Sequence, residues 1–344
     1  MADIILADDG IVFDGRSIEL GPLGGAESSF IELANALAAR GHRVRVWNRC
    51  AARLTHQGVD WMPLSGALPE QADLYIANRD TRLLRHVPKA QRRAFWIHNP
   101  ARYLLKPRHQ FRLAHYRPII IFLGEDHARG YPRWASSGGR RIIPYGLTAL
   151  FRGATERSPP PPRAVFTSNP LRSLDWVLDS WEQRIHPEIP NAEFHIFAGA
   201  ATYGAAGSAK AGAMAPVLER AQALSSAGVV LRGPVAKAQL AEELQQARVL
   251  LYRGDIGETF CLAVGEAQAM GVPAVLEDIA CMRERVRHAE TGYVVRGADA
   301  FADAALSLLR DDELWISQHR ACLAKQRHIS WQDSAQLFET LLAP

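Results

Sequence analysis

The stretch of sequence that decides the fold is GETFCLAVGEAQAMGVP, residues 257–273. It follows an apolar run, 248–252, that is typical of a buried strand. Residues 260–270 are mostly good helix formers, and Gly271 and Pro273 are typical of a helix end. The pattern predicts a strand, a loop and a helix, with Glu258 at the helix mouth and Glu266 about two turns along the helix.

Two kinds of ligand group suit this pattern. A helix that begins at the carboxyl end of a parallel strand presents unpaired backbone N–H groups and a partial positive charge, which favour a phosphate. The carboxylates of Glu258 and Glu266 are strong acceptors for hydroxyl donors. Together these groups predict a site for a sugar nucleotide. The alternative is a surface helix that happens to carry two glutamates.

Length and composition limit the class of protein. The chain has 344 residues, of which 48% are hydrophobic and 22% charged, as in a globular protein of two domains. The net charge of +4 does not argue for nucleic acid. We expect no signal peptide and no membrane-spanning helix. The cysteines lack metal-ligand spacing, so we expect reduced thiols in the cytoplasm; they are Cys50, Cys261, Cys281 and Cys322.

The first half of the chain alternates strands and helices. An apolar run at 4–7, a loop with Gly24 and Gly25, a helical pattern at 26–40 and a strand at 44–47 form a βαβ unit. The glycine pair allows a ligand to approach the helix mouth, although a tight turn would use the same residues. Further apolar runs stand at 59–62, 74–77, 94–97, 119–123 and 142–143. This alternation predicts an α/β fold with a parallel, doubly wound sheet.

Two motifs resemble a known family. Residues 258–261 and 266–275 resemble the Glu, seven residues, Glu signature of the retaining nucleotide-sugar glycosyltransferases of the GT-B type, glycosyltransferase family 4 (group 1). Residues 24–27 and 41–44 resemble the opening of the same family, and the resemblance spans most of the chain. It implies two Rossmann-like doubly wound domains facing across a cleft, with a C-terminal helix that crosses back to the N-terminal domain.

The resemblance implies roles for individual residues. His98, which follows an expected strand, would orient the donor sugar, and Glu258 would hold its hydroxyls; these are the candidate catalytic residues. Glu266 would bind the ribose. The other candidate donor-binding residues are Gly24, Gly25, Ser168, Arg172, Gly199, Val235, Thr259, Phe260, Cys261 and Leu262.

The phosphate-binding part departs from the family in one respect. Arg172 stands where the family commonly has a lysine, and either cation can neutralise a leaving diphosphate. The second cation that the family often has nearby is missing, since Ser168 and Asn169 occupy that neighbourhood. We expect no metal and no cofactor, because the chain has no Asp-x-Asp pair and an arginine with a helix mouth can stabilise the diphosphate.

Residues 79–117 form a basic stretch, with eleven lysines and arginines against the single acid Asp80 and with aromatic residues between them. The stretch is a candidate surface for anionic membrane lipids or a phosphorylated acceptor. A solvated basic face and a nucleic-acid surface would look similar.

The expected domains follow from a run of four prolines at 159–162, which is typical of a stiff linker. We expect an N-terminal Rossmann-like acceptor-binding domain at 1–153 and a linker at 154–163. A C-terminal Rossmann-like nucleotide-sugar-binding domain would follow at 164–329. A helix at 330–344, with Ser330 and Asp333 as its N-terminal cap, would pack on the first domain.

The predicted function is that of a retaining, metal-independent glycosyltransferase. It would move a sugar from a nucleoside-diphosphate sugar to a glycan or lipid-linked acceptor, in the synthesis of polysaccharide, lipopolysaccharide or glycolipid. We expect a cytoplasmic protein, peripheral on the inner face of the membrane, with no nucleic-acid partner. The alternatives are an epimerase or hydrolase of the same fold and a non-enzymatic polyanion-binding protein. A nicotinamide-dependent oxidoreductase is disfavoured because Gly-x-Gly-x-x-Gly is absent after the first strand.

Overall fold

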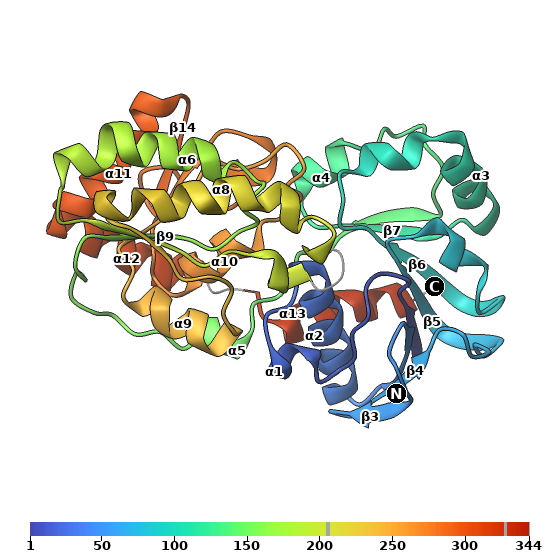
Figure 1. Cartoon of the computed structure of the whole chain (residues 1–344). Helices are drawn as coiled ribbons and strands as arrows, with labels where there is room; N and C mark the ends of the chain where they lie inside the picture. The colour runs from blue at the N-terminus through green and yellow to red at the C-terminus, as the bar shows by residue number, and fades with distance from the viewer. Residues whose placement is uncertain (204–206, 327–328, 344) are drawn as a thin grey trace. The chain divides into compact units, whose positions relative to one another are not determined.

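The computed structural model describes residues 1–203, 207–326 and 329–343. The chain divides into two compact units (Figure 1). Unit 1 consists of Met1–Leu20, Gly24–Gly146 and Ile329–Pro344, and unit 2 consists of Gly21–Leu23 and Leu147–His328. Each unit has its own sheet, so the prediction of two α/β domains is confirmed. Among the described residues, no helix has the length and apolar character that crossing a membrane requires.

Unit 1 is built on an eight-stranded sheet that grows in both directions from β1, in the order β3-β4-β2-β1-β5-β6-β7-β8. Its strands are β1 (Asp3–Ala7), β2 (Arg43–Asn48), β3 (Leu54–His56), β4 (Val59–Pro63), β5 (Gln71–Asn78), β6 (Lys89–Trp96), β7 (Ile119–Phe122) and β8 (Gly139–Ile142). The sheet is parallel, as expected, except at one edge, where β3 and β4 are antiparallel. Gln57 and Gly58 join them, and both have the positive φ of a two-residue hairpin turn.

The helices of unit 1 include one that comes from the end of the chain. They are α1 (Ser17–Leu20), α2 (Gly25–Ala39), η1 (Thr81–Arg85), η2 (Ala101–Leu105), α3 (Pro107–Tyr116), α4 (Glu125–Arg129), α13 (Trp331–Glu339) and η8 (Thr340–Leu342). In Figure 1 the red helix α13 lies beside the blue helix α2. Ser330 and Asp333 form the predicted capping box at its start. Glu339 at its end pairs with Arg40, so the expected return of this helix to the first domain is confirmed.

Unit 2 is built on six parallel strands in the order β11-β10-β9-β12-β13-β14, which is the doubly wound arrangement of a Rossmann fold. Its strands are β9 (Arg163–Phe166), β10 (Glu193–Ile196), β11 (Val229–Leu231), β12 (Val249–Tyr252), β13 (Ala274–Glu277) and β14 (Gly292–Val295). Its helices are α5 (Ala149–Arg152), α6 (Leu174–Ser180), η3 (Trp181–Ile185), η4 (His186–Glu188), η5 (Ala200–Tyr203), α8 (Ala211–Ala223), η6 (Leu224–Ala227), α9 (Lys237–Gln245), α10 (Leu262–Ala269), η7 (Ala280–Glu284), α11 (Ala298–Arg310) and α12 (Asp312–Lys325).

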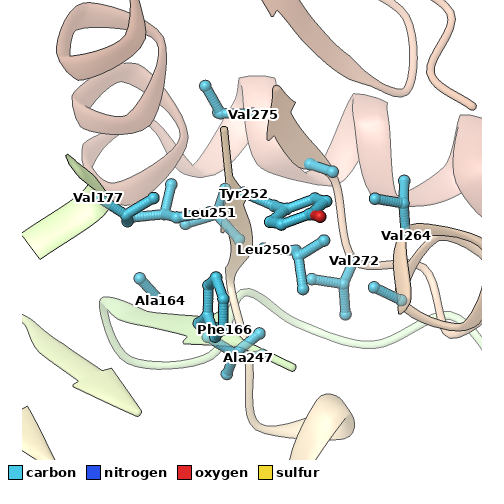
Figure 2. Packing of buried hydrophobic residues seen from close by; sticks show 14 of the residues in the cluster. Ala164, Phe166, Val177, Ala247, Leu250, Leu251, Tyr252, Val264, Val272 and Val275 are labelled. Carbon is cyan, nitrogen blue, oxygen red and sulfur yellow. The ribbon is translucent and has the colours of Figure 1, made fainter. Parts of the chain in front are cut away.

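The core of unit 2 surrounds β12, all of whose residues are buried. Figure 2 shows Leu250, Leu251 and Tyr252 packed among apolar side chains from β9, α6 and α10. Burial on both faces explains the unbroken apolar run that predicted this strand. It also fixes the position at which β12 ends, and therefore the loop at 253–261 that leads into α10.

Candidate functional site

The loop between β12 and α10 brings two of the predicted residues together. Glu258 is buried, and its Oε1 accepts hydrogen bonds from the hydroxyl of Tyr252 at 2.6 Å and from Nη1 of Arg172 at 2.5 Å. Burial alone would lower the pKa of Arg172, but the charge of Glu258 outweighs it and holds that pKa above its usual range. Oε2 of Glu258 accepts no hydrogen bond from any described residue, and it is not enclosed.

Glu266 is held in the same way by a residue that the sequence analysis did not identify. Its Oε1 lies 2.5 Å from Nζ of Lys237, the first residue of α9. Oε2 of Glu266 likewise has no partner among the described residues and is not enclosed. Each glutamate therefore has one oxygen fixed by a cation and one oxygen available to a ligand.

The mouth of α10 lies between these two carboxylates in the chain. Thr259 and Phe260 are buried, and Cys261 adopts a left-handed backbone conformation with φ of 61°. No side chain caps the first turn of α10, which begins at Leu262. The N–H of Val264 in that turn faces the sulfur of Cys261, and the remaining N–H groups with the helix dipole favour an anion.

A small pocket of about 60 Å³ connects other predicted residues to Lys237. Its lining residues, all of unit 2, are Pro22, Leu23, Thr167, Ser168, Phe197, Thr202, Pro234, Val235, Lys237 and Leu240. Gly199 lies beside this pocket, because a Cβ on it would approach Cδ of Pro234 to 2.8 Å. The structure thus gathers Ser168, Val235 and, through Lys237, Glu266, and it assigns Gly199 a packing role.

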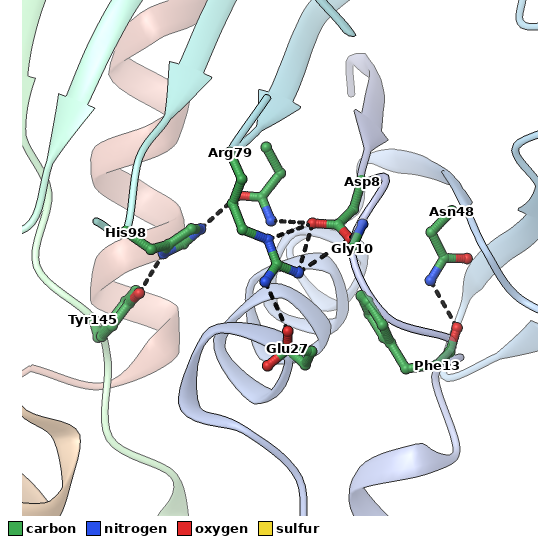
Figure 3. Close-up of polar contacts among 9 residues, drawn as sticks. Asp8, Gly10, Phe13, Glu27, Asn48, Arg79, His98 and Tyr145 are labelled. Atoms are coloured by element: carbon green, nitrogen blue, oxygen red, sulfur yellow. Dashed lines mark hydrogen bonds and ion pairs between the residues drawn. The ribbon is translucent and has the colours of Figure 1, made fainter. Parts of the chain in front are cut away.

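His98 belongs to unit 1, where it is part of a network of hydrogen-bonded polar side chains (Figure 3). Asp8 can only accept, so Nδ2 of Asn78 donates to it at 2.6 Å, and Oδ1 of Asn78 faces Nε2 of His98 at 2.5 Å. His98 therefore carries its proton on Nε2, and Nδ1 accepts from the hydroxyl of Tyr145. Burial, followed by the charges of Arg79 and His127, keeps the pKa of His98 well below its usual value.

The same hydrogen-bond network continues from Asp8 through two ion pairs of Arg79. Nε of Arg79 donates to Asp8 at 2.9 Å, and its Nη1 donates to Glu27 at 2.7 Å. Asp8 and His98 follow the strands β1 and β6, and Asn78 is the last residue of β5, so this network occupies the carboxyl edge where α/β sheets bind ligands. Gly24 precedes α2 in an ordinary extended conformation, and Gly25 is the first residue of α2. Neither residue has the positive φ that would require a glycine at its position.

The basic stretch is not one continuous surface. Arg79 is part of the buried network, and Arg93 donates to the carbonyls of Leu84, His86 and Val87. The interpretation of these two arginines as surface cations is wrong, because the fold uses both as internal donors. Other members line a groove of about 680 Å³, whose residues are Arg82, Arg85, Pro107, Arg108, Phe111, Arg112, His115 and Tyr116.

Most of the residues that the sequence analysis missed become visible only through tertiary contacts. Asp8 and Asn78 follow apolar runs directly, so their position at strand ends was a usable signal. A second usable signal was Lys237, because a lysine at the first position of a helix opposes the helix dipole and is therefore unusual there. Tyr252 and Tyr145 carried no such signal. Among the described residues, no group of three or more His, Cys, Asp or Glu side chains could hold a metal ion.

Comparisons with known proteins place this geometry in a class. Residues 161–311 match the family model described as Glycosyl transferases group 1. The phosphatidyl-myo-inositol mannosyltransferase of Mycobacterium leprae is 37% identical over 84 residues, which are 24% of this chain and 22% of that protein. The chain therefore matches less than a quarter of the length of that relative.

Two solved structures show the same architecture over the whole chain. Sucrose-phosphate synthase from Thermosynechococcus elongatus gives a TM-score of 0.72 at 16% identity, covering 99% of each chain. HepE from Anabaena, in complex with UDP and glucose, gives 0.70 at 13% identity, covering 100% of each. The chain has the GT-B fold that the resemblance implied, and its residues 161–311 are similar to the group 1 glycosyltransferases.

Proposed function

We propose that this protein is a glycosyltransferase that moves a sugar from a nucleoside-diphosphate sugar, bound by unit 2, to an acceptor hydroxyl. The observation that supports this most strongly is the state of the two glutamates. Glu258 and Glu266 each have Oε1 tied to a cation, at 2.5 Å, and Oε2 open. A carboxylate held in this way is oriented in advance to accept hydrogen bonds from hydroxyl groups, which sugars and ribose supply.

Each residue of the site has a part in this proposal. Glu266 accepts from the ribose hydroxyls, and the pocket that contains Ser168 and Val235 lies next to the base. Glu258 holds hydroxyls of the donor sugar. Arg172 is 40% exposed and has donors left after its bond to Glu258, so it can contact the diphosphate together with the N–H groups at the start of α10.

The chemistry that these residues supply is mainly electrostatic. Negative charge develops on the diphosphate as the bond to the sugar breaks, and fixed donors aimed at that charge lower the barrier. The proposal includes metal-independent transfer with retention of the anomeric configuration, supported by the family motif at 258–275. His98, neutral and held by Tyr145 and Asn78, would orient the donor sugar.

The acceptor is proposed to be a glycan or a lipid-linked sugar at an anionic membrane surface. The groove of unit 1 supports this part, since Arg85 and Arg108 have no acidic partner among the described residues and Phe111 beside them is 76% exposed. Cations and an exposed aromatic ring together suit lipid headgroups. The name of the Mycobacterium leprae relative, which includes phosphatidyl-myo-inositol, is in agreement.

A sedimentation assay tests the membrane part separately. Vesicles with phosphatidylglycerol should sediment the protein, and neutral phosphatidylcholine vesicles should not. The double variant Arg85→Gln, Arg108→Gln should lose this binding, whereas Arg163→Gln, in unit 2 and paired with Glu193, should keep it. Equal binding to both kinds of vesicle would exclude the proposed surface.

A thermal-shift panel of nucleoside diphosphates and their sugars tests the donor site, because a ligand that binds the folded state raises its melting temperature. UDP and GDP, with their glucose and mannose conjugates, are the first probes. Glu266→Ala should lower the affinity of the preferred nucleotide about 100-fold, since about two charge-assisted hydrogen bonds are lost. Glu258→Ala should retain nucleotide binding and lose turnover.

Glu242→Ala is the matched control, because Glu242 is an exposed glutamate of the same unit. It should change neither nucleotide binding nor turnover. Wild-type turnover in Glu258→Ala, or nucleotide affinity that is equal in Glu266→Ala and Glu242→Ala, would contradict the assignment. Release of the nucleotide without any acceptor product would instead support a hydrolase of the same fold.

A further inference from the structure

One arginine of unit 2 is half-buried and makes no ion pair with any described residue. Arg285 directly follows η7, and its Nε is enclosed and makes no hydrogen bond to any described residue. Within the described part of the chain it makes no ion pair, although Arg283 pairs with Asp278 and Arg287 with Glu290. Its guanidinium carbon lies 4.0 Å from the centroid of the Phe260 ring.

This arrangement is costly unless an anion completes it. The enclosed Nε of Arg285 has left water without a hydrogen-bond partner, and the loss of hydration free energy is restored only in part by the contact with an aromatic face. Burial accordingly lowers the pKa of Arg285 from its usual value. Nearby arginines avoid this cost, since Arg172 is paired with Glu258 and Arg253 with Glu277.

The position of Arg285 suggests which anion would complete it. Strands β12 and β13 are neighbours, and the loops at their carboxyl ends carry Phe260 and η7 respectively. Phe260 stands between Glu258 and the start of α10. Arg285 therefore stacks on the same short segment whose N–H groups and flanking carboxylate form the candidate donor site.

We infer that Arg285 is a ligand for the diphosphate of the nucleotide sugar, held in place by the face of Phe260. This inference rests on the proposed function. Arg172 shares its charge with Glu258, whereas Arg285 makes no ion pair with a carboxylate among the described residues. Its contact would be with the phosphate farther from the nucleoside, because Phe260 follows Glu258, the residue proposed to hold the sugar.

Nucleotide binding by the full chain tests this inference. Calorimetric titrations with UDP, UMP and uridine, and with GDP, GMP and guanosine, are compared for wild type, Arg285→Gln and Arg285→Lys. Arg285→Gln should weaken diphosphate binding about 10-fold to 100-fold, weaken monophosphate binding much less and leave nucleoside binding unchanged. Arg285→Lys should retain part of the diphosphate preference, because it keeps the charge without the planar guanidinium.

Two controls separate a binding role from a structural one. Arg287→Gln removes the same charge from an exposed position two residues away and should bind as wild type does. The melting temperature of Arg285→Gln without nucleotide should not fall below that of wild type, because no ion pair is lost. A fall in that temperature with no change in the ratio of diphosphate to monophosphate affinity would show a structural role and overturn the inference.

The failure of the inference can be distinguished from the failure of the proposed function. If wild type and Arg285→Gln bind UDP or GDP equally well, the inference is wrong and the donor site stands. If wild type binds no nucleoside diphosphate, the proposed function and the inference both fall. Phe260→Leu, with Arg285 retained, should show a smaller loss of diphosphate affinity than Arg285→Gln, since only the supporting ring is removed.

Discussion

The carboxyl edges of the two sheets use polar side chains in opposite ways. In unit 1, Asp8, Glu27 and Arg79 bind one another in the interior, and both ring nitrogens of His98 are engaged (Figure 3). In unit 2, Glu258 and Glu266 are each fixed through one oxygen and open at the other. The same doubly wound arrangement therefore carries a network of polar side chains that bind one another in unit 1. In unit 2 it carries carboxylates that are oriented to accept hydrogen bonds from a ligand. Substitutions should cost mainly stability in unit 1 and mainly ligand binding in unit 2.

The largest expected effect on stability is that of Asp8→Asn. Asp8 is fully buried, and the change leaves the guanidinium of Arg79 with Glu27 as its remaining carboxylate; breaking a buried pair costs about 3–5 kcal/mol. Urea denaturation should show this loss. Asp9→Asn is the control, because its partner Arg82 is 63% exposed and such pairs contribute at most about 1 kcal/mol. Equal losses for Asp8→Asn and Asp9→Asn would contradict the contrast between the units.

Acidification should destabilise unit 1 next most strongly. His127 is buried and neutral, since its Nδ1 accepts from the N–H of Leu123 and its Nε2 donates to the carbonyl of Asn99. Burial lowers its pKa to about 4. As the pH falls, the unfolded state binds a proton on His127 at a higher pH than the folded state does. The contribution of His127 to the free energy of unfolding is therefore fully present above about pH 6.5, and about 3 kcal/mol is lost as the pH drops to about 4.

Denaturation midpoints between pH 7 and pH 4 measure this loss. His127→Gln should flatten the pH dependence, although part of it should remain, because the lowered pKa of His98 acts in the same direction. His115→Gln, at an exposed position, should leave the dependence as it is in wild type. A pH dependence that is identical in all three proteins would show that His127 is not the responsible group.

Lys237→Met should have a smaller effect on stability and a clear effect on binding. Lys237 is partly exposed, and a cation at the first turn of α9 opposes the helix dipole, so the cost in stability should stay below about 1 kcal/mol. Glu266 would lose the partner that fixes its Oε1, and nucleotide affinity should fall about tenfold. A large loss of stability with unchanged affinity would mean that this ion pair serves the fold, as the network of unit 1 does.

Tyr145→Phe should likewise have only a small effect on stability. It removes one hydroxyl that donates to Nδ1 of His98, at a cost of about 1 kcal/mol. Without that donor a proton enters Nδ1 more easily, so the pKa of His98 should rise. The acid limb of the pH profile of kcat/KM should then move to higher pH, if His98 contacts the donor sugar. An unmoved limb would separate His98 from the reaction.

The fold was predictable to a large extent because its signals are local. The apolar run before Glu258, the helix end at Gly271 and the cap at Ser330 each depend on neighbouring residues, and each is present in the structure. The antiparallel strand β3 was missed because Gln57 takes the place of the Asn or Asp that usually marks such a turn.

The site was predictable only in part. Arg172 and Glu258, which were expected at the diphosphate and at the sugar of one donor, are 86 residues apart in the chain and form an ion pair. The partners that orient the glutamates and His98 depend on distances that no spacing in the sequence expresses. Lys237 is 29 residues from Glu266, and Tyr145 is 47 residues from His98. The exclusion of Arg79 and Arg93 from the basic surface has the same cause.

The return of α13 to unit 1 has a consequence for synthesis of the chain. A Cβ on Gly146 would come within 2.3 Å of the backbone nitrogen of Trp331, so within unit 1 the segment that ends at Gly146 packs against the start of α13. The N-terminal core acquires Trp331 and Phe338 only after the whole Leu147–His328 segment has left the ribosome. During translation unit 2 can fold first, while the earlier-made unit waits with part of its apolar surface uncovered.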